Sequence, residues 1–168
     1  MTEFYEPTTP ATSRAEVFLG YLDYFRARVI EKVSALPPVD QRQSRLPSGW
    51  TPVELLKHLR YMERRWIEWR FEDRQMDSPW GDQHEGRWHV PADETLADLV
   101  ESLGAQATYT RTFVTKTDLS TVGRPGDNWP GDPPPTLERV LFHMFQEYAR
   151  HLGQLDVATE LAGGDQGE

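Results

Sequence analysis

The sequence predicts an all-α fold, a four-helix bundle with long connecting loops. Four segments of the 168-residue chain carry apolar residues at helical spacing, and no segment shows convincing strand alternation. Each segment begins at a residue that suits the N-cap position, at Ser13, Thr51, Thr95 and Thr136. Long amphipathic helices without strands are typical of helical bundles. With 38% hydrophobic residues, the chain is predicted to form a single domain over residues 1–168.

The first helix is predicted to follow Ser13, because Glu16 three residues later completes a capping box. Apolar residues recur on one face of this helix until Pro37 and Pro38 end it. The preceding residues 1–12 contain prolines and several threonines, so we expect an extended arm there.

The second helix follows a polar, proline-containing loop and is predicted to run from Thr51 to about Arg74. Proline at its first position and Glu54 as the capping-box residue strengthen this start. His58 lies beside the apolar residues of this helix, so we expect its ring to face inward or nearly so.

Four arginines along the second helix have two interpretations. They can bind an anionic substrate, or they can form a solvated face paired with glutamates such as Glu63, and the solvated face is favoured. These arginines are Arg60, Arg64, Arg65 and Arg70.

The remaining chain contains two helices separated by long irregular segments. Residues 75–92 show no sustained period and are predicted to be a loop. The third helix starts at Thr95, and residues 116–135 contain too many prolines and glycines for regular structure. The fourth helix starts at Thr136 and ends before a short tail at residues 163–168, which opens with two glycines.

Composition excludes several classes of function. With 27 acidic and 18 basic residues, the net charge is −9, so we expect no nucleic-acid partner. No apolar run approaches the roughly 20 residues that span a bilayer, and the N-terminus lacks the features of a signal peptide. We therefore expect a cytoplasmic protein without a membrane partner. The chain contains no cysteine, so any thiol chemistry must use a thiol brought from outside.

The clearest chemical signal lies in the fourth helix, where Glu147 and His151 fall on the apolar face. Burying an ionised carboxylate without a partner costs several kcal/mol, so such a group normally has a hydrogen-bonded partner, a shifted pKa or a metal. The i, i+4 spacing places the two side chains about 6 Å apart at Cβ, which lets both bind one ion.

Together with His58 from the second helix, this pair forms a candidate site for one divalent metal ion. Three protein ligands leave coordination positions open, as in catalytic zinc sites. Histidine and carboxylate ligands suit zinc, nickel or iron. The alternative is a buried salt bridge between Glu147 and a histidine or an arginine, and the spacing alone does not decide between the two.

Three further histidines and one glutamate give weaker signals. His143 can be a fourth ligand or a partner that orients Glu147, but a satisfied histidine at a helix interface is favoured. His84 and His89 lie in the predicted loop and are expected to be exposed, although they could help to close a substrate pocket. Glu54 is expected to serve as a capping residue rather than as a ligand in a two-metal site.

The segments WTPVELLKHL, which contains His58, and HMFQEYARHLGQLD, which contains Glu147 and His151, resemble the DinB-like superfamily of metal-binding four-helix bundles. The resemblance covers most of the chain and implies that these three residues hold a divalent ion. The His, Glu, His set is similar to the metal-binding domain of mycothiol-dependent maleylpyruvate isomerases, which implies zinc. Gln154 also falls where the superfamily pattern places a glutamine.

Three classes of function are considered for the candidate site and the resemblance. The first is a metal-dependent S-transferase or isomerase that uses mycothiol or a similar low-molecular-weight thiol and a small-molecule substrate, with a metal-dependent hydrolase as a variant. The second is a non-catalytic metal-binding or small-molecule-binding protein of a stress response, and the third is a structural bundle with a buried ion pair. Superfamily members are commonly dimers, so a homodimer is compatible with the resemblance.

Overall fold

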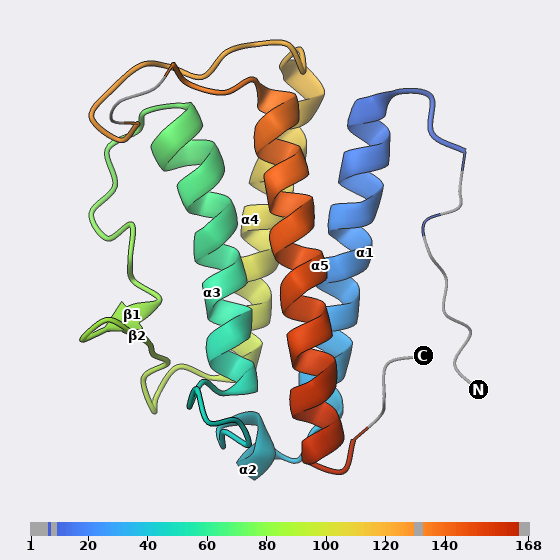
Figure 1. Ribbon diagram of the computed structural model, residues 1–168, viewed down its shortest axis with the longest axis vertical. Helices are drawn as coiled ribbons and strands as arrows, with labels where there is room; N and C mark the ends of the chain where they lie inside the picture. Colours follow the sequence, from blue (N-terminus) through green and yellow to red (C-terminus); the bar gives the residue numbers. More distant parts are fainter. Residues whose placement is uncertain (1–6, 8–9, 130–132, 165–168) are drawn as a thin grey trace.

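The computed structural model describes residues 7, 10–129 and 133–164 and shows four long helices side by side (Figure 1). The long helices are α1 (Arg14–Ala35), α3 (Pro52–Arg64) with its π-helical continuation η1 (Arg65–Phe71), α4 (Leu96–Lys116) and α5 (Leu137–Leu161). The short elements are α2 (Pro38–Gln41) and a hairpin of β1 (Gln83–His84) and β2 (Arg87–Trp88). The all-α fold is confirmed. Most of the predicted arm and most of the predicted tail lie outside the described residues.

The four predicted helix starts are confirmed. In each case the side-chain oxygen of the predicted N-cap residue accepts a hydrogen bond from a backbone N–H three residues later. Thr51 forms a full capping box with Glu54, which accounts for that carboxylate as predicted. No helix among the described residues is long and apolar enough to cross a membrane.

Four local features differ from the prediction. At the first helix the carboxylate of Glu16 accepts hydrogen bonds from Thr12 rather than from the backbone N–H of Ser13, so the predicted capping box is not formed. The first interhelical loop contains the single turn α2, which starts with proline at its first position. The segment predicted as a loop forms the β1–β2 hairpin, whose turn residues Glu85 and Gly86 have φ values of 50° and 75°. The second long helix widens into a π-helix over its last seven residues, a form that occurs often at functional sites.

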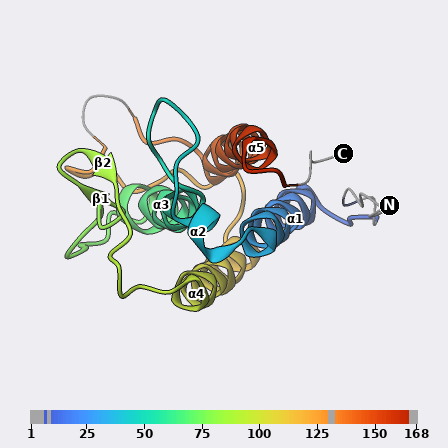
Figure 2. The same cartoon turned by 90° about the horizontal axis from the view of Figure 1, so that it is seen from below.

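The order and direction of the helices explain where the long connection runs. Figure 2 shows α3 between α4 and α5, with α1 on the opposite side of the bundle. In Figure 1, α3 and α4 run in the same direction, so the chain must return along the length of α3 before α4 begins. The β1–β2 hairpin lies on this returning segment. The segment therefore contributes side chains to the flank of α3.

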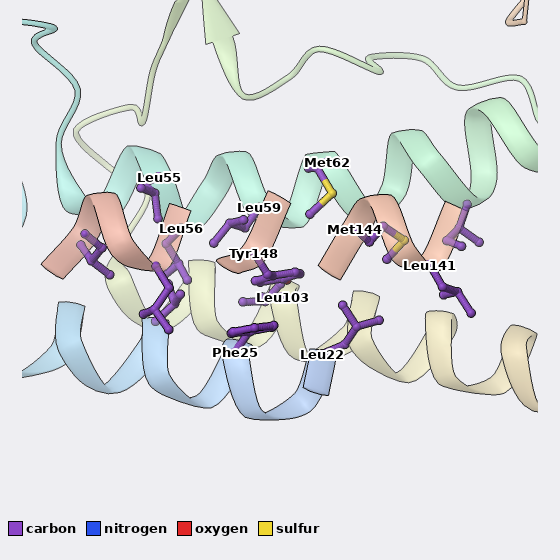
Figure 3. Packing of buried hydrophobic residues seen from close by; sticks show 14 of the residues in the cluster. Leu22, Phe25, Leu55, Leu56, Leu59, Met62, Leu103, Leu141, Met144 and Tyr148 are labelled. Carbon is purple, nitrogen blue, oxygen red and sulfur yellow. The ribbon is translucent and has the colours of Figure 1, made fainter. Parts of the chain in front are cut away.

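One hydrophobic core runs between the four long helices. Leucines and methionines of α3 and α5 interdigitate with aromatic and aliphatic side chains of α1 and α4 (Figure 3). Tyr148 is the largest of the fully buried side chains, and its ring stacks on Phe25. The helix faces predicted from apolar spacing are the faces that pack.

A buried polar network crosses this core. Glu63 of α3 is fully buried and accepts hydrogen bonds from Arg26 of α1 at 2.7 and 2.8 Å and from Thr110 of α4 at 2.9 Å. Its third partner, which donates the fourth hydrogen bond, is the hydroxyl of Tyr148 on α5, whose pKa is raised well above its ordinary value by burial. The prediction of a solvated face for Glu63 is therefore wrong. The network contains one residue from each long helix, so it helps to fix the register of the four helices. Its member on α5, Tyr148, directly follows Glu147 in the sequence.

Candidate metal centre

His58, Glu147 and His151 lie together between α3 and α5. One ligand atom from each side chain can be chosen so that all three atoms lie within 4.8 Å of one another. The side chain of His151 is 9% exposed, that of His58 is 13% exposed and that of Glu147 is 24% exposed. The cluster is thus nearly buried but open on the side of the carboxylate.

Helix geometry accounts for this arrangement. Glu147 and His151 are one turn apart on α5, on the flank of the stripe that packs into the core. His58 lies in the middle of α3, which packs directly against α5. Because the core fixes both helices, the three side chains are placed by secondary structure rather than by loops.

A buried carboxylate from the returning segment holds His58. Nδ1 of His58 lies 3.0 Å from Oδ2 of Asp82, whose side chain is fully buried. Arg65 donates to both oxygens of the same carboxylate, at 2.7 and 3.1 Å, so Asp82 is an ionised acceptor. His58 must therefore donate from Nδ1, which leaves Nε2 as the ring nitrogen with a lone pair.

The two residues on α5 are also held by neighbours. Nδ1 of His151 lies 2.9 Å from Oε1 of Gln154, which leaves its Nε2 directed at Oε2 of Glu147 at 3.2 Å. Nε2 of His143 lies 3.3 Å from the other oxygen, Oε1, of Glu147. His143 therefore contacts the carboxylate of Glu147, whereas the sequence favoured a satisfied histidine at a helix interface over the two roles beside Glu147.

Protonation states favour ligand chemistry. Burial is the largest effect on the pKa of His58 and lowers it, despite the opposing hydrogen bond to Asp82. Hydrogen bonds from His143 and His151 hold the pKa of Glu147 far below its ordinary value. Burial alone raises the pKa of Asp82, but the hydrogen bonds from His58 and Arg65 outweigh burial and lower it. The neutral imidazole of His58 thus lies close to the ionised carboxylate of Glu147.

Tryptophans enclose the cluster. Trp88 of β2 stacks on His58 with 4.1 Å between ring centroids and meets His151 edge-on at 5.5 Å. Away from Trp88, a pocket of about 180 Å³ opens beside the cluster, and we call it the ligand pocket. It is lined by His58, Met62, Arg65, Trp66, Arg70, Trp80, His143 and Glu147.

This donor set suits a divalent cation. A protonated His151 would satisfy Glu147 as an ion pair, which is the alternative left open by the sequence. That ion pair gives no role to Nε2 of His58, whose ring is held in the neutral tautomer that binds metals. Two imidazole nitrogens and one carboxylate, each with a hydrogen-bonded outer neighbour, are what zinc and similar metals require.

The other residues considered from the sequence do not belong to the cluster of three candidate ligands. His84 and His89 are exposed on the hairpin segment, as expected, with 5.4 Å between their ring centroids. Arg65 was placed on a solvated face by the sequence, but its side chain is only 6% exposed because it pairs with Asp82. Asp82 was not singled out, because an aspartate in a segment without periodicity gives no signal of its position.

Comparisons with known proteins agree with this fold. The model of the mycothiol S-transferase family matches residues 17–164. Among solved structures, a conserved protein from Enterococcus faecalis superposes with a TM-score of 0.61 at 18% sequence identity, over 92% of this chain and 100% of that chain. This likeness concerns the fold. No curated protein sequence matches the chain.

Proposed function

Because the chain belongs to the mycothiol S-transferase family, we propose that it is a metal-dependent thiol transferase. His58, Glu147 and His151 hold one divalent ion, and mycothiol or a similar low-molecular-weight thiol attacks an electrophilic small molecule. The proposal is supported mainly by the neutral His58 ring, which buried Asp82 holds with Nε2 available beside Glu147 and His151. Zinc is the proposed metal, and nickel or iron suit the same ligands.

When bound, the ion lowers the pKa of a thiol and holds the thiolate, which is the nucleophile. The chain supplies no sulfur nucleophile of its own, since it contains no cysteine. Nε2 of His143 donates to Oε1 of Glu147, so Nδ1 is the ring nitrogen left to accept a proton, and the His143 side chain lines the ligand pocket. Nδ1 of His143 is thus the proposed acceptor of the proton that the thiol loses.

The ligand pocket provides the second substrate site. Trp66 and Trp80 line this pocket, with the guanidinium groups of Arg70 and Arg65 over their rings, and they limit the access of water to the reacting carbon of the electrophile. In a substitution, the thiol sulfur forms a bond to that carbon while the leaving group departs with the bonding electron pair. Orientation of both reactants in one pocket supplies much of the rate enhancement.

The first experiment measures metal content. We expect about one zinc per chain in protein purified without a chelator or a histidine tag, and almost none in His58→Ala or His151→Ala. His84→Ala is the matched control, because it removes an exposed imidazole from the same protein. Elemental mass spectrometry of the four proteins gives the comparison.

Metal content and activity separate the alternatives. The transferase proposal requires zinc-dependent consumption of mycothiol thiol in the presence of an alkyl halide, and its loss in His58→Ala. Stoichiometric zinc without thiol consumption by any electrophile would indicate a non-catalytic metal-binding protein. If neither the purified protein nor protein given excess zinc held metal, the cluster would be a structural ion pair.

Two finer expectations accompany this proposal. A low-molecular-weight thiol as co-substrate is consistent with a cytoplasmic enzyme, because thiols stay reduced there. A homodimer remains a prediction, and size-exclusion chromatography with light scattering tests it.

A further inference from the structure

Arg70 is a cation at the ligand pocket and has no anionic partner among the residues that the structure describes. It lies in η1 and lines the pocket together with His58 and Glu147. Its guanidinium carbon lies 4.7 Å from the ring centroid of Trp66 and 5.5 Å from that of Trp129. Within residues 10–129 and 133–164, no carboxylate forms an ion pair or a hydrogen bond with it.

Two neighbouring arginines, unlike Arg70, have carboxylate partners. Arg65 lines the same pocket, but its charge is balanced by the buried Asp82. Arg74, three residues after the end of η1, binds the hydroxyl of Tyr109 and the carboxylate of Glu68. Burial is the largest influence on the pKa of Arg70 and lowers it, with the charge of Arg65 acting in the same direction. An anion bound to Arg70 would oppose both effects, because it favours the charged guanidinium.

The charges in the pocket define what it can accept. Arg65 and Asp82 cancel, and Glu147 neutralises half of the charge of a divalent ion. One positive charge then remains at the ion and one at Arg70. A thiolate matches the first of these charges, and an anionic group on the electrophile matches the second. The pocket is thus cationic within a chain whose net charge is −9.

Spacing along the helix sets the position of this charge relative to the reacting thiolate. His58 lies in α3 and Arg70 in η1, twelve residues apart along one continuous helical segment, so the two side chains lie at different levels along it. Both line the ligand pocket, and the guanidinium of Arg70 lies over the ring of Trp66. The anion must therefore be several bonds away from the reacting atom.

We propose that Arg70 binds a carboxylate on the electrophilic substrate, while the planar body of the substrate lies in the ligand pocket beside Trp66 and Trp80. This inference rests on the proposed transferase function and narrows its substrate class to anionic electrophiles. A guanidinium held over indole rings presents its N–H fork edge-on, which is the geometry that carboxylates accept. The carboxylate and the leaving group of such a substrate are at opposite ends of its planar body, and the thiol sulfur displaces the leaving group.

Calorimetric titration of metal-free protein tests the subsite without involving zinc, which could itself bind a carboxylate. The probes are 4-methylbenzoate and 4-methylbenzamide, which have nearly the same shape but differ in charge. We expect the native protein to bind the benzoate at least about tenfold more tightly than the benzamide. In Arg70→Gln the benzoate should lose about tenfold or more in affinity, while the benzamide should be unaffected.

Two further variants complete the design. Arg74→Gln is the matched control, since it removes a guanidinium four residues from Arg70 that binds Tyr109 and does not line the pocket, and it should bind both probes normally. Arg70→Lys should retain part of the preference for the benzoate, because it keeps the charge but loses the fork. Equal affinity of the native protein for both probes, or an equal loss of both in Arg70→Gln, would overturn the proposal.

A kinetic comparison separates this inference from the transferase proposal. Zinc-loaded protein is given mycothiol and either 4-(chloromethyl)benzoate or 4-(chloromethyl)benzamide, each of which releases chloride as the carbon–sulfur bond forms. We expect a higher kcat/KM for the benzoate and the loss of this advantage in Arg70→Gln. Inactivity toward both compounds would contradict the transferase proposal while leaving the calorimetric result as the measure of the subsite.

Discussion

Asp82→Asn tests whether the returning segment tunes the metal centre. Asp82 is fully buried and makes three hydrogen bonds, two from Arg65 at 2.7 and 3.1 Å and one from His58 at 3.0 Å. The amide keeps the shape but removes the charge. His58 then loses the ionised acceptor that fixes its tautomer and increases its basicity, and Arg65 loses its counter-ion.

Both losses can be given magnitudes. Removing an outer partner of a metal ligand typically weakens metal binding by about 10- to 100-fold, which corresponds to about 1.4–2.7 kcal/mol. Breaking a buried ion pair costs about 3–5 kcal/mol, and the lower end applies because asparagine can still accept a hydrogen bond. For a chain of this length, 3 kcal/mol lowers Tm by roughly 6–12 °C.

The assay combines zinc affinity, from competition with a chromophoric chelator at neutral pH, with thermal unfolding of metal-free protein. Glu63→Gln is the matched control, because it breaks another buried ion pair, with Arg26, without touching a metal ligand. We expect both variants to lose stability but only Asp82→Asn to lose zinc affinity. Zinc affinity of Asp82→Asn within about threefold of the native value would refute the reasoning.

Three further predictions concern the neighbours of the ligands. Gln154→Leu removes the acceptor at Nδ1 of His151, so zinc affinity should fall about tenfold in the same competition assay, and an unchanged affinity would contradict the assigned contact. The pKa of Asp82 is lowered in the folded state, so its contribution to stability is present above about pH 4 and is lost as pH falls further. Between pH 2.5 and 6, the Tm of metal-free Asp82→Asn should therefore depend less steeply on pH than the Tm of the native protein. Parallel curves of Tm against pH for the two proteins would contradict this prediction. Trp88→Leu removes the ring stacked on His58, and zinc should then dissociate faster in stopped-flow exchange, whereas an unchanged rate would argue against shielding by the indole.

Much of the fold could be predicted because its helices are long, amphipathic and capped. The N-cap residues predicted from the sequence are those that cap the helices, and the apolar faces are buried as their spacing indicates. The π-helical continuation η1 could not be predicted in the same way. The spacing of its apolar residues does not distinguish a π-turn from an α-turn over only seven positions.

The candidate ligands could be predicted for the same reason, since Glu147 and His151 lie on a helix where spacing specifies a common face. Their outer neighbours fall into two groups. Gln154 and His143 are on the same helix and lie within one turn of the residues they contact. His143 was considered because of its spacing from Glu147, and Gln154 because of the superfamily pattern. Asp82 lies 24 residues from His58, and local spacing gives no information on that contact.

The direction of the helices accounts for this difference. Since α3 and α4 run in the same direction, the chain between them must travel back along the bundle, and it passes the middle of α3 on the way (Figure 1). A direct antiparallel connection would have left His58 without Asp82 and without Trp88. The connection that looked like an unstructured loop in the sequence therefore supplies the buried carboxylate and the tryptophan wall of the site. For this reason, substitutions in residues 79–88 should change metal binding more than substitutions of equal size in α2, which lies at the end of the bundle.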